Sequence, residues 1–130
     1  MGDEHTLEFL LAFDGRVHWL EEGYWLKFAI RRVAPSEQRP HGLRYALTLH
    51  APDGTRLLGF DNAHRVRTSQ GRTIVADHWH RTEHDDGRPY EFRDADTLLA
   101  DFFREVRRIL GERGLSDAVT RVEEQGRDDP

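Results

Sequence analysis

Two short stretches of this sequence contain the residue types that perform acid–base or metal chemistry. The first is Asp61-Asn62-Ala63-His64, and the second is Asp77-His78-Trp79-His80. If the second stretch is extended, His78 and His80 project from one face with their Cα atoms about 7 Å apart. Two imidazoles at that spacing can bind one metal ion or act as an acid–base pair on one phosphate.

The His-x-His pair is a weak motif by itself, because eight histidines in 130 residues often fall at that spacing by chance. Structural roles compete with the chemical ones: hydrogen-bonded histidines, and an Asx turn at Asp61-Asn62. A metal site would need a further ligand, for which Asp61, Asp77 and His64 are the candidates. The chain has no cysteine, so a disulfide, a cysteine–zinc site and a thiol nucleophile are excluded.

Alternating apolar residues predict the strands that position these groups. Tyr24 to Arg31 and Leu43 to His50 have the period of half-buried strands, and Ala51-Pro52-Asp53-Gly54 supplies turn residues before a third strand, Thr55 to Phe60. Leu43 to Phe60 is therefore the strongest predicted hairpin. A second hairpin is predicted from Trp79 to Glu83 and Pro89 to Phe92.

Two registers of the first hairpin decide where Asp61 points. A two-residue turn at Asp53-Gly54 places Asp61 opposite Ala46 on a polar face. A type I turn with Gly54 as the bulge residue places Asp61 across from Tyr45 on the apolar face. Because burial of a carboxylate without compensation is costly, we favour the first register.

At the N-terminus, Leu7 to Phe13 and Val17 to Leu20 flank Asp14-Gly15 and are interpreted as a weaker strand pair, although Leu7 to Phe13 also fits a helix. One helix is secure. It begins near Asp94, a good N-cap, and its apolar residues form a continuous stripe as far as Leu110.

The predicted fold class is α+β. An antiparallel sheet of about four to six strands carries the C-terminal amphipathic helix on one face, with a short second helix expected from Ser116 to about Glu124. The length fits one domain, residues 1–130, with a core over about 7–113 and a tail over 114–130. The other face of the sheet is left for function.

Charge and hydropathy limit the function classes. The net charge is −5, which disfavours nucleic-acid coating by the overall field, yet Arg16 to Arg81 contains eleven basic and six acidic residues. Of the 19 basic residues all but Lys27 are arginine, which suits phosphate contacts; a GC-rich genome is the competing explanation. No apolar run approaches the ~20 residues of a membrane span, and the N-terminus is acidic, so we expect a cytoplasmic protein.

Taken in order, several of these motifs resemble the TumE family of toxin–antitoxin toxins. They are Leu58-Gly59-Phe60-Asp61-Asn62, Asp77-His78-Trp79-His80, Pro89-Tyr90-Glu91-Phe92 and a Leu- and Phe-rich helix containing Asp101-Phe102. The resemblance covers roughly Tyr24 to Leu110. It departs from the family pattern in a longer insert at residues 63–76 and in the tail after Leu110.

The resemblance implies a bacterial toxin encoded beside a helix-turn-helix antitoxin, and a ribonuclease mechanism is a common expectation for such toxins. A metal-independent ribonuclease needs a base for the 2′-OH, an acid for the leaving oxygen and cations for the phosphorane. The expected catalytic residues are His78, His80, Asp61 and Arg81.

The candidate substrate-binding residues are Asn62, Arg44, Tyr90 and His64. No cofactor is expected, with a divalent metal at His78, His80 and Asp77 as the alternative site. A second alternative is a non-enzymatic module that binds RNA or a protein. The sequence is also compatible with a homodimer of this chain.

Overall fold

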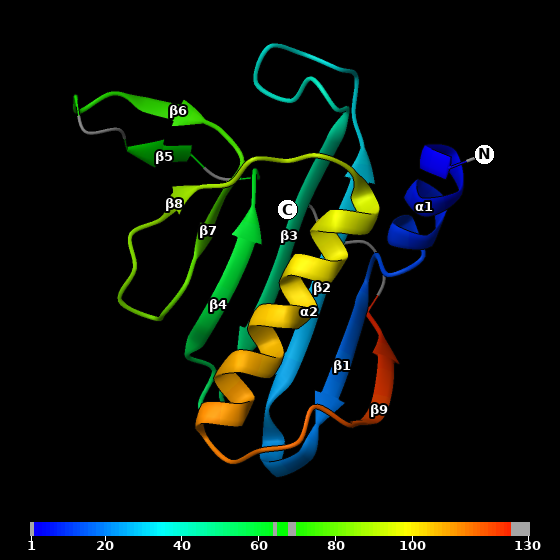
Figure 1. Cartoon of the computed structure of the whole chain (residues 1–130), viewed down its shortest axis with the longest axis vertical. Helices are drawn as coiled ribbons and strands as arrows, with labels where there is room; N and C mark the ends of the chain where they lie inside the picture. Colours follow the sequence, from blue (N-terminus) through cyan, green and yellow to red (C-terminus); the bar gives the residue numbers. More distant parts are fainter. Residues whose placement is uncertain (1, 64, 68–69, 126–130) are drawn as a thin grey trace.

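The computed structural model describes residues 2–63, 65–67 and 70–125, and among them every side chain except those of residues 2–6, 65–67 and 73–75. Its main feature is a seven-stranded antiparallel sheet in the order β8-β7-β4-β3-β2-β1-β9 (Figure 1). The strands of this sheet are β1 (Arg16–Leu20), β2 (Trp25–Arg32), β3 (Leu43–His50), β4 (Arg56–Asp61), β7 (His78–His80), β8 (Arg88–Pro89) and β9 (Val119–Glu124). A 3₁₀ turn, η1 (Glu21–Gly23), joins β1 to β2, and β5 (Arg65–Arg67) pairs with β6 (Thr73–Val75) as a separate hairpin.

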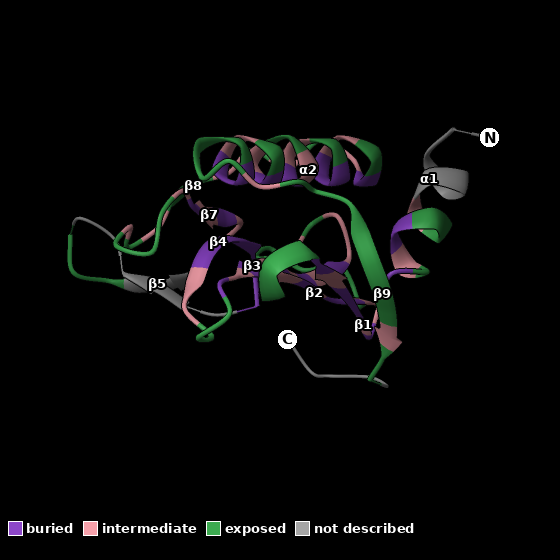
Figure 2. Cartoon of the chain, turned by 90° about the horizontal axis from the view of Figure 1, so that it is seen from below, coloured by how far each residue is buried: buried purple, intermediate pink, exposed green. Residues whose placement is uncertain are grey.

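One face of the sheet is covered by α2 (Ala95–Glu112), which crosses the strands diagonally (Figures 1 and 2). Asp94 caps this helix, because its Oδ1 accepts a hydrogen bond of 2.7 Å from the Thr97 N–H. The buried residues of the helix form the predicted stripe: Ala95, Leu98, Leu99, Phe102, Val106, Ile109 and Leu110. The predicted α+β class, with an amphipathic helix packed on one sheet face, is confirmed.

The β3–β4 hairpin combines features of both predicted registers. Ala46 pairs with Asp61 and Leu47 with Phe60, so the favoured register is confirmed along the body of the hairpin. At the tip, however, Gly54 has a positive φ of 92° and its N–H bonds to the Ala51 carbonyl, as in a type I turn followed by a bulge residue. A second irregularity, near residue 57, restores the first register before the chain reaches Asp61.

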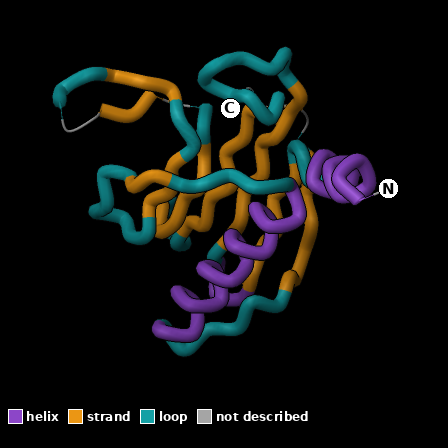
Figure 3. The backbone as a smooth tube through the Cα atoms, turned by 45° about the horizontal axis from the view of Figure 1, so that its top comes forward, coloured by secondary structure: helices purple, strands orange, loops and turns teal. Residues whose placement is uncertain are grey.

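Two terminal predictions need correction. Residues 7–11 belong to a helix, α1 (Gly2–Leu11), rather than to the strand first preferred, because Leu7, Leu10 and Leu11 share a helical face. The short helix expected over 116–124 is instead the edge strand β9, in which the β-branched residues Val119 and Val122 pair with Leu20 and His18 of β1. The second helix of the fold is thus α1, which contacts α2 and lies at the β1 end of the sheet (Figure 3).

The sheet face opposite α2 carries no helix among the described residues (Figure 2). Because directly paired residues of antiparallel strands point to the same face, the register assigns side chains to this open face. Lys27, Thr48, Gly59 and His80 form one row across it, and Ala29, Ala46, Asp61 and His78 form the next. Within the described residues, no helix is long and apolar enough to cross a membrane.

Candidate catalytic site

A histidine pair and a carboxylate meet where β4 lies against β7. Asp61 is paired with His78 and Gly59 with His80, so all three functional side chains belong to the open face. Phe60 and Trp79, which alternate with them, turn to the other face and stack there with ring centroids 5.2 Å apart. Period-two alternation therefore places the chemical groups on one side of these strands and core aromatics on the other.

The three side chains form one compact cluster. The His78 Nε2 atom lies 3.3 Å from the Asp61 Oδ2 atom, and the two imidazole centroids are 5.0 Å apart with rings nearly perpendicular. The exposed fractions are 5% for Asp61, 4% for His78 and 8% for His80. Two motifs separated by 12 residues of sequence thus form one buried polar site.

Backbone carbonyls fix which ring nitrogen of each histidine carries a proton. The Nδ1 atom of His78 lies 2.9 Å from the Ala76 carbonyl oxygen, and that of His80 lies 2.8 Å from the Asp85 carbonyl oxygen. Because a carbonyl oxygen only accepts, each Nδ1–H must be the donor. In both rings Nε2 is then the atom that gains or loses a proton, or that binds a metal.

The two imidazoles have pKa values shifted in opposite directions. Burial lowers the pKa of His78, but the hydrogen bond to Asp61, the bond to the Ala76 carbonyl and the Asp61 charge outweigh it, so the pKa is raised from 6.5. For His80, burial and the charges of Arg56 and His78 outweigh the Asp85 carbonyl and Asp61, so the pKa is lowered. Near neutral pH this arrangement favours a charged His78 beside a neutral His80.

Asn62 holds Asp61 in position and does not face the cluster. Its side chain is fully buried, with Oδ1 accepting from the Tyr45 N–H at 3.0 Å and Nδ2 donating to the Leu43 carbonyl at 2.8 Å. Asp61 itself forms the Asx turn considered above, because its Oδ1 accepts from the Ala63 N–H at 3.1 Å. The amide thus extends the β3–β4 pairing by one residue, although it was a candidate for substrate binding.

Asp77 lies apart from the histidine cluster. Its Oδ2 atom accepts a 2.6 Å hydrogen bond from the Tyr45 hydroxyl and lies 3.0 Å from His41 Nε2, on the side of the sheet that faces α2. Burial and the neighbouring Asp77 charge raise the pKa of Tyr45, which keeps the phenol protonated as a donor. The described residues that could share a metal ion are therefore Asp61, His78 and His80, and Asp77 is not among them.

The remaining candidates are spread over both faces. Arg81 lines a cavity of about 300 Å³ beside α2, together with Arg108, so it does not face the histidines. Tyr90 also lies on the α2 side, where its hydroxyl donates to Asp101 at 2.7 Å. Arg44 is on the open face, because it lies two residues before Ala46 on β3. His64 lies outside the described residues.

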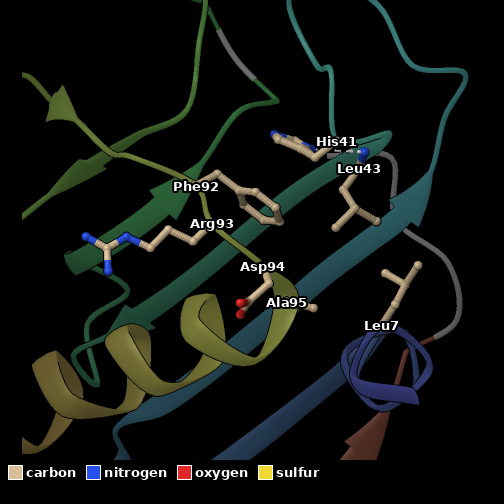
Figure 4. Close-up of a pocket in the computed structure, with 7 residues that line it drawn as sticks. All are labelled: Leu7, His41, Leu43, Phe92, Arg93, Asp94 and Ala95. Carbon is tan, nitrogen blue, oxygen red and sulfur yellow. Dashed lines mark hydrogen bonds between the residues drawn. The ribbon is translucent and has the colours of Figure 1, made fainter. Parts of the chain in front are cut away.

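Sequence reasoning missed His41 and Arg56. His41 belongs to the β2–β3 loop, packs on Phe92 with ring centroids 4.0 Å apart, and lines a cavity of about 170 Å³ at the start of α2 (Figure 4). No strand or helix period assigns such a loop residue to a site. Arg56 is two residues from Leu58, so regular strand alternation would place it on the apolar face. The irregularity in β4 instead brings Arg56 to the open face, opposite His50.

Comparison with known proteins gives one match. A family model described as Toxin TumE matches residues 5–110, a range that includes both motifs and α2. No curated protein and no solved structure shows a significant match to this chain.

Proposed function

The chain belongs to the TumE family of toxins, and on this premise we propose that it acts on RNA in the cytoplasm as a small ribonuclease. Membership of a toxin family implies an antitoxin partner, which we propose is a helix-turn-helix protein. The observation that carries the proposed chemistry is the pair of adjacent imidazoles with fixed Nδ1–H groups and oppositely shifted pKa values. Paired groups with divergent pKa values are typical of acid–base catalysis.

In the proposed reaction, His80 is the base. Its neutral Nε2 atom takes the proton of an RNA 2′-OH while the 2′-oxygen forms a bond to phosphorus. His78, kept protonated by Asp61, gives a proton to the 5′-oxygen as the P–O5′ bond breaks. The products are a 2′,3′-cyclic phosphate and a 5′-hydroxyl, so no co-reactant is needed.

A growth assay tests this assignment. Expression without an antitoxin is expected to arrest growth, and His80→Gln is expected to abolish the arrest because the base is lost. His84→Gln is the matched control, since the His84 side chain is 88% exposed in the turn after β7 and should leave the arrest intact. Full toxicity of soluble, folded His80→Gln protein would remove His80 from the mechanism.

A divalent-metal site is the second candidate, and one observation favours it. Asp61, His78 and His80 can each offer a ligand atom within 4.8 Å of the others, and both Nδ1–H groups bond to carbonyls as those of metal-bound histidines usually do. Two ligands at about 2.1 Å from one tetrahedral zinc ion lie roughly 3.4 Å apart, so the ligand atoms of the cluster would move closer together on binding. Zinc or manganese would then act as a Lewis acid on the phosphate.

Calorimetric titration with zinc and manganese separates the two candidates. The metal candidate predicts one ion per chain, binding lost in Asp61→Asn, and binding retained in Asp77→Asn, because Asp77 lies on the other face. The acid–base candidate predicts no stoichiometric binding and cleavage that persists in chelator. Stoichiometric binding together with chelator-sensitive cleavage would decide for the metal.

A further inference from the structure

The open face beside the histidine cluster has a floor of small residues. Ala29, Ala46, Asp61 and His78 lie in register across β2, β3, β4 and β7. Two alanine methyl groups thus stand next to the reactive side chains, between a row that contains Arg31 and Arg44 and a row that contains Gly59.

Arg56 reaches this floor from one side because Gly59 has no side chain. A Cβ atom built on Gly59 would lie 3.4 Å from Arg56 Cδ and 3.7 Å from His80 Cδ2, so the arginine side chain lies over Gly59 and close to the imidazole. The Arg56 Nε atom is buried and has no hydrogen-bond partner within the described part of the chain. A buried guanidinium nitrogen without a partner is costly unless an acceptor arrives.

Arg44 borders the floor from the other side. It lies directly opposite Arg31 on β2, so two arginine side chains stand next to each other on this face. Its Nε atom is likewise buried without a hydrogen-bond partner among the described residues. Two arginines with open hydrogen-bonding capacity therefore flank the alanine floor, one on each side of it.

Aromatic rings extend from Arg56 along the same face. Trp19 and Trp25 stack with centroids 5.4 Å apart, and Trp25 lies 4.5 Å from His50, which is paired with Arg56. These three rings are half-buried, so part of each ring faces solvent. Arginines beside aromatic rings on a sheet are typical of surfaces that bind single-stranded nucleic acid, where phosphates and base faces are contacted together.

We infer that Arg44 and Arg56 bind a phosphate of single-stranded RNA over Ala29 and Ala46, beside Asp61, His78 and His80. The inference rests on the proposed function and adds to it the substrate contacts and the face over which the strand runs. Guanidinium groups match phosphate oxygens with two parallel hydrogen bonds. In this arrangement Arg44 has the substrate-binding role for which the sequence had offered it, and Arg56 takes the phosphate-binding role for which the sequence had offered Arg81.

Salt-dependent binding tests the inference. The probe is a labelled single-stranded 2′-O-methyl RNA, which binds but has no free 2′-OH to react, and fluorescence anisotropy gives the affinity of the full-length chain. Arg44→Gln and Arg56→Gln should each weaken binding about tenfold at low salt. Each should also lower the slope of log K against log salt by about 0.7, the value for one phosphate contact with a single strand.

Two further variants make the result specific. Arg107→Gln alters an exposed arginine of α2 on the opposite side of the sheet and should leave affinity and slope unchanged. Arg44→Lys keeps the charge but loses the two-pronged geometry, so it should keep the slope and still lose affinity. Far-ultraviolet circular dichroism of each variant checks that it is folded.

The possible outcomes separate the inference from the proposed function. If wild-type protein binds and cleaves RNA while Arg44→Gln and Arg56→Gln match it in affinity and slope, the phosphate site is wrong and the ribonuclease stands. If wild-type protein binds no RNA even at low salt, both are overturned. Losses confined to the two arginine variants, with normal binding by Arg107→Gln, establish the site.

Discussion

The chemistry proposed for His78 and His80 depends on hydrogen bonds to two carbonyl oxygens. Each carbonyl fixes the Nδ1–H tautomer, so the difference between the rings arises at Nε2: Asp61 lies 3.3 Å from that atom in His78. His80 Nε2 has no hydrogen-bond partner within the described residues. The same ring type, with one tautomer, can thus serve as an acid at one position and as a base at the next.

The pH dependence of RNA cleavage follows from these opposite shifts. The rate should rise as pH increases through the pKa of His80, which lies below 6.5, because the base must lose its proton. It should fall as pH passes the pKa of His78, above 6.5, because the acid must keep its proton. A bell-shaped profile of kcat/KM with a plateau spanning 6.5 is therefore expected.

The control for this profile is Asp61→Asn. Without the carboxylate, burial still lowers the pKa of His78 while its main opposing influence is lost, so the alkaline limb should move to lower pH. An alkaline limb that stays in place in this variant would show that His78 is not the acid. Stability gives a second check: the contribution of the raised His78 pKa is complete below 6.5 and is lost as pH rises through the folded-state value.

Among the elements, β4 and β7 build the site and β3 keeps it in register. Asn62 continues the β3–β4 pairing beyond Asp61 by bonding to both the Tyr45 N–H and the Leu43 carbonyl. Arg39 adds a bond of 2.9 Å from its guanidinium to the Asn62 carbonyl. The loop before β3 therefore helps to hold the backbone on which Asp61 is mounted.

Asn62→Ala should destabilise the fold by roughly 2–4 kcal/mol, because it leaves a buried N–H and a buried carbonyl without partners. Urea unfolding measures the difference. Gln38→Ala, which removes an exposed amide from the β2–β3 loop, is the matched control and should change the free energy of unfolding by less than about 0.5 kcal/mol. Equal stability of the two variants would show that Asn62 does not lock the strand pair.

Local patterns in the sequence were sufficient to predict α2, the β3–β4 hairpin and the placement of Asp61, because each depends on a periodicity that burial enforces. The hairpin predicted over 79–83 and 89–92 is shorter than expected, with His78 paired to Pro89 and Trp79 to Arg88. Alternation also separates Asp77 and Arg81 from His78 and His80, since residues of opposite parity in a strand face opposite ways. The sheet face on which Arg56 lies was not predictable. An extra residue in β4 moves Arg56 to the opposite face from the one that alternation predicts, and this irregularity is visible only in the completed hairpin. His41 meets Asp77 through loop closure, which leaves no local pattern.

Over the whole molecule, an acidic chain concentrates cationic groups where the proposed substrate would lie. The net charge is −5, yet Lys27, Arg31, Arg44 and Arg56 all belong to the face opposite α2. A local field of this kind can attract a phosphate backbone although the overall field does not. The sheet therefore has two distinct faces: its apolar face packs on α2 to form the core, and its open face carries the residues of the proposed site.

The most direct test of the proposed reaction is the identity of the ends that the purified protein leaves on RNA. Incubation with single-stranded RNA in excess chelator, followed by mass spectrometry, should reveal 2′,3′-cyclic phosphate and 5′-hydroxyl ends, none of which form with His80→Gln. DNA of the same sequence should stay intact, because it lacks the 2′-OH. Intact RNA, or cleavage that requires an added divalent metal and leaves a 5′-phosphate, would contradict acid–base catalysis by His78 and His80.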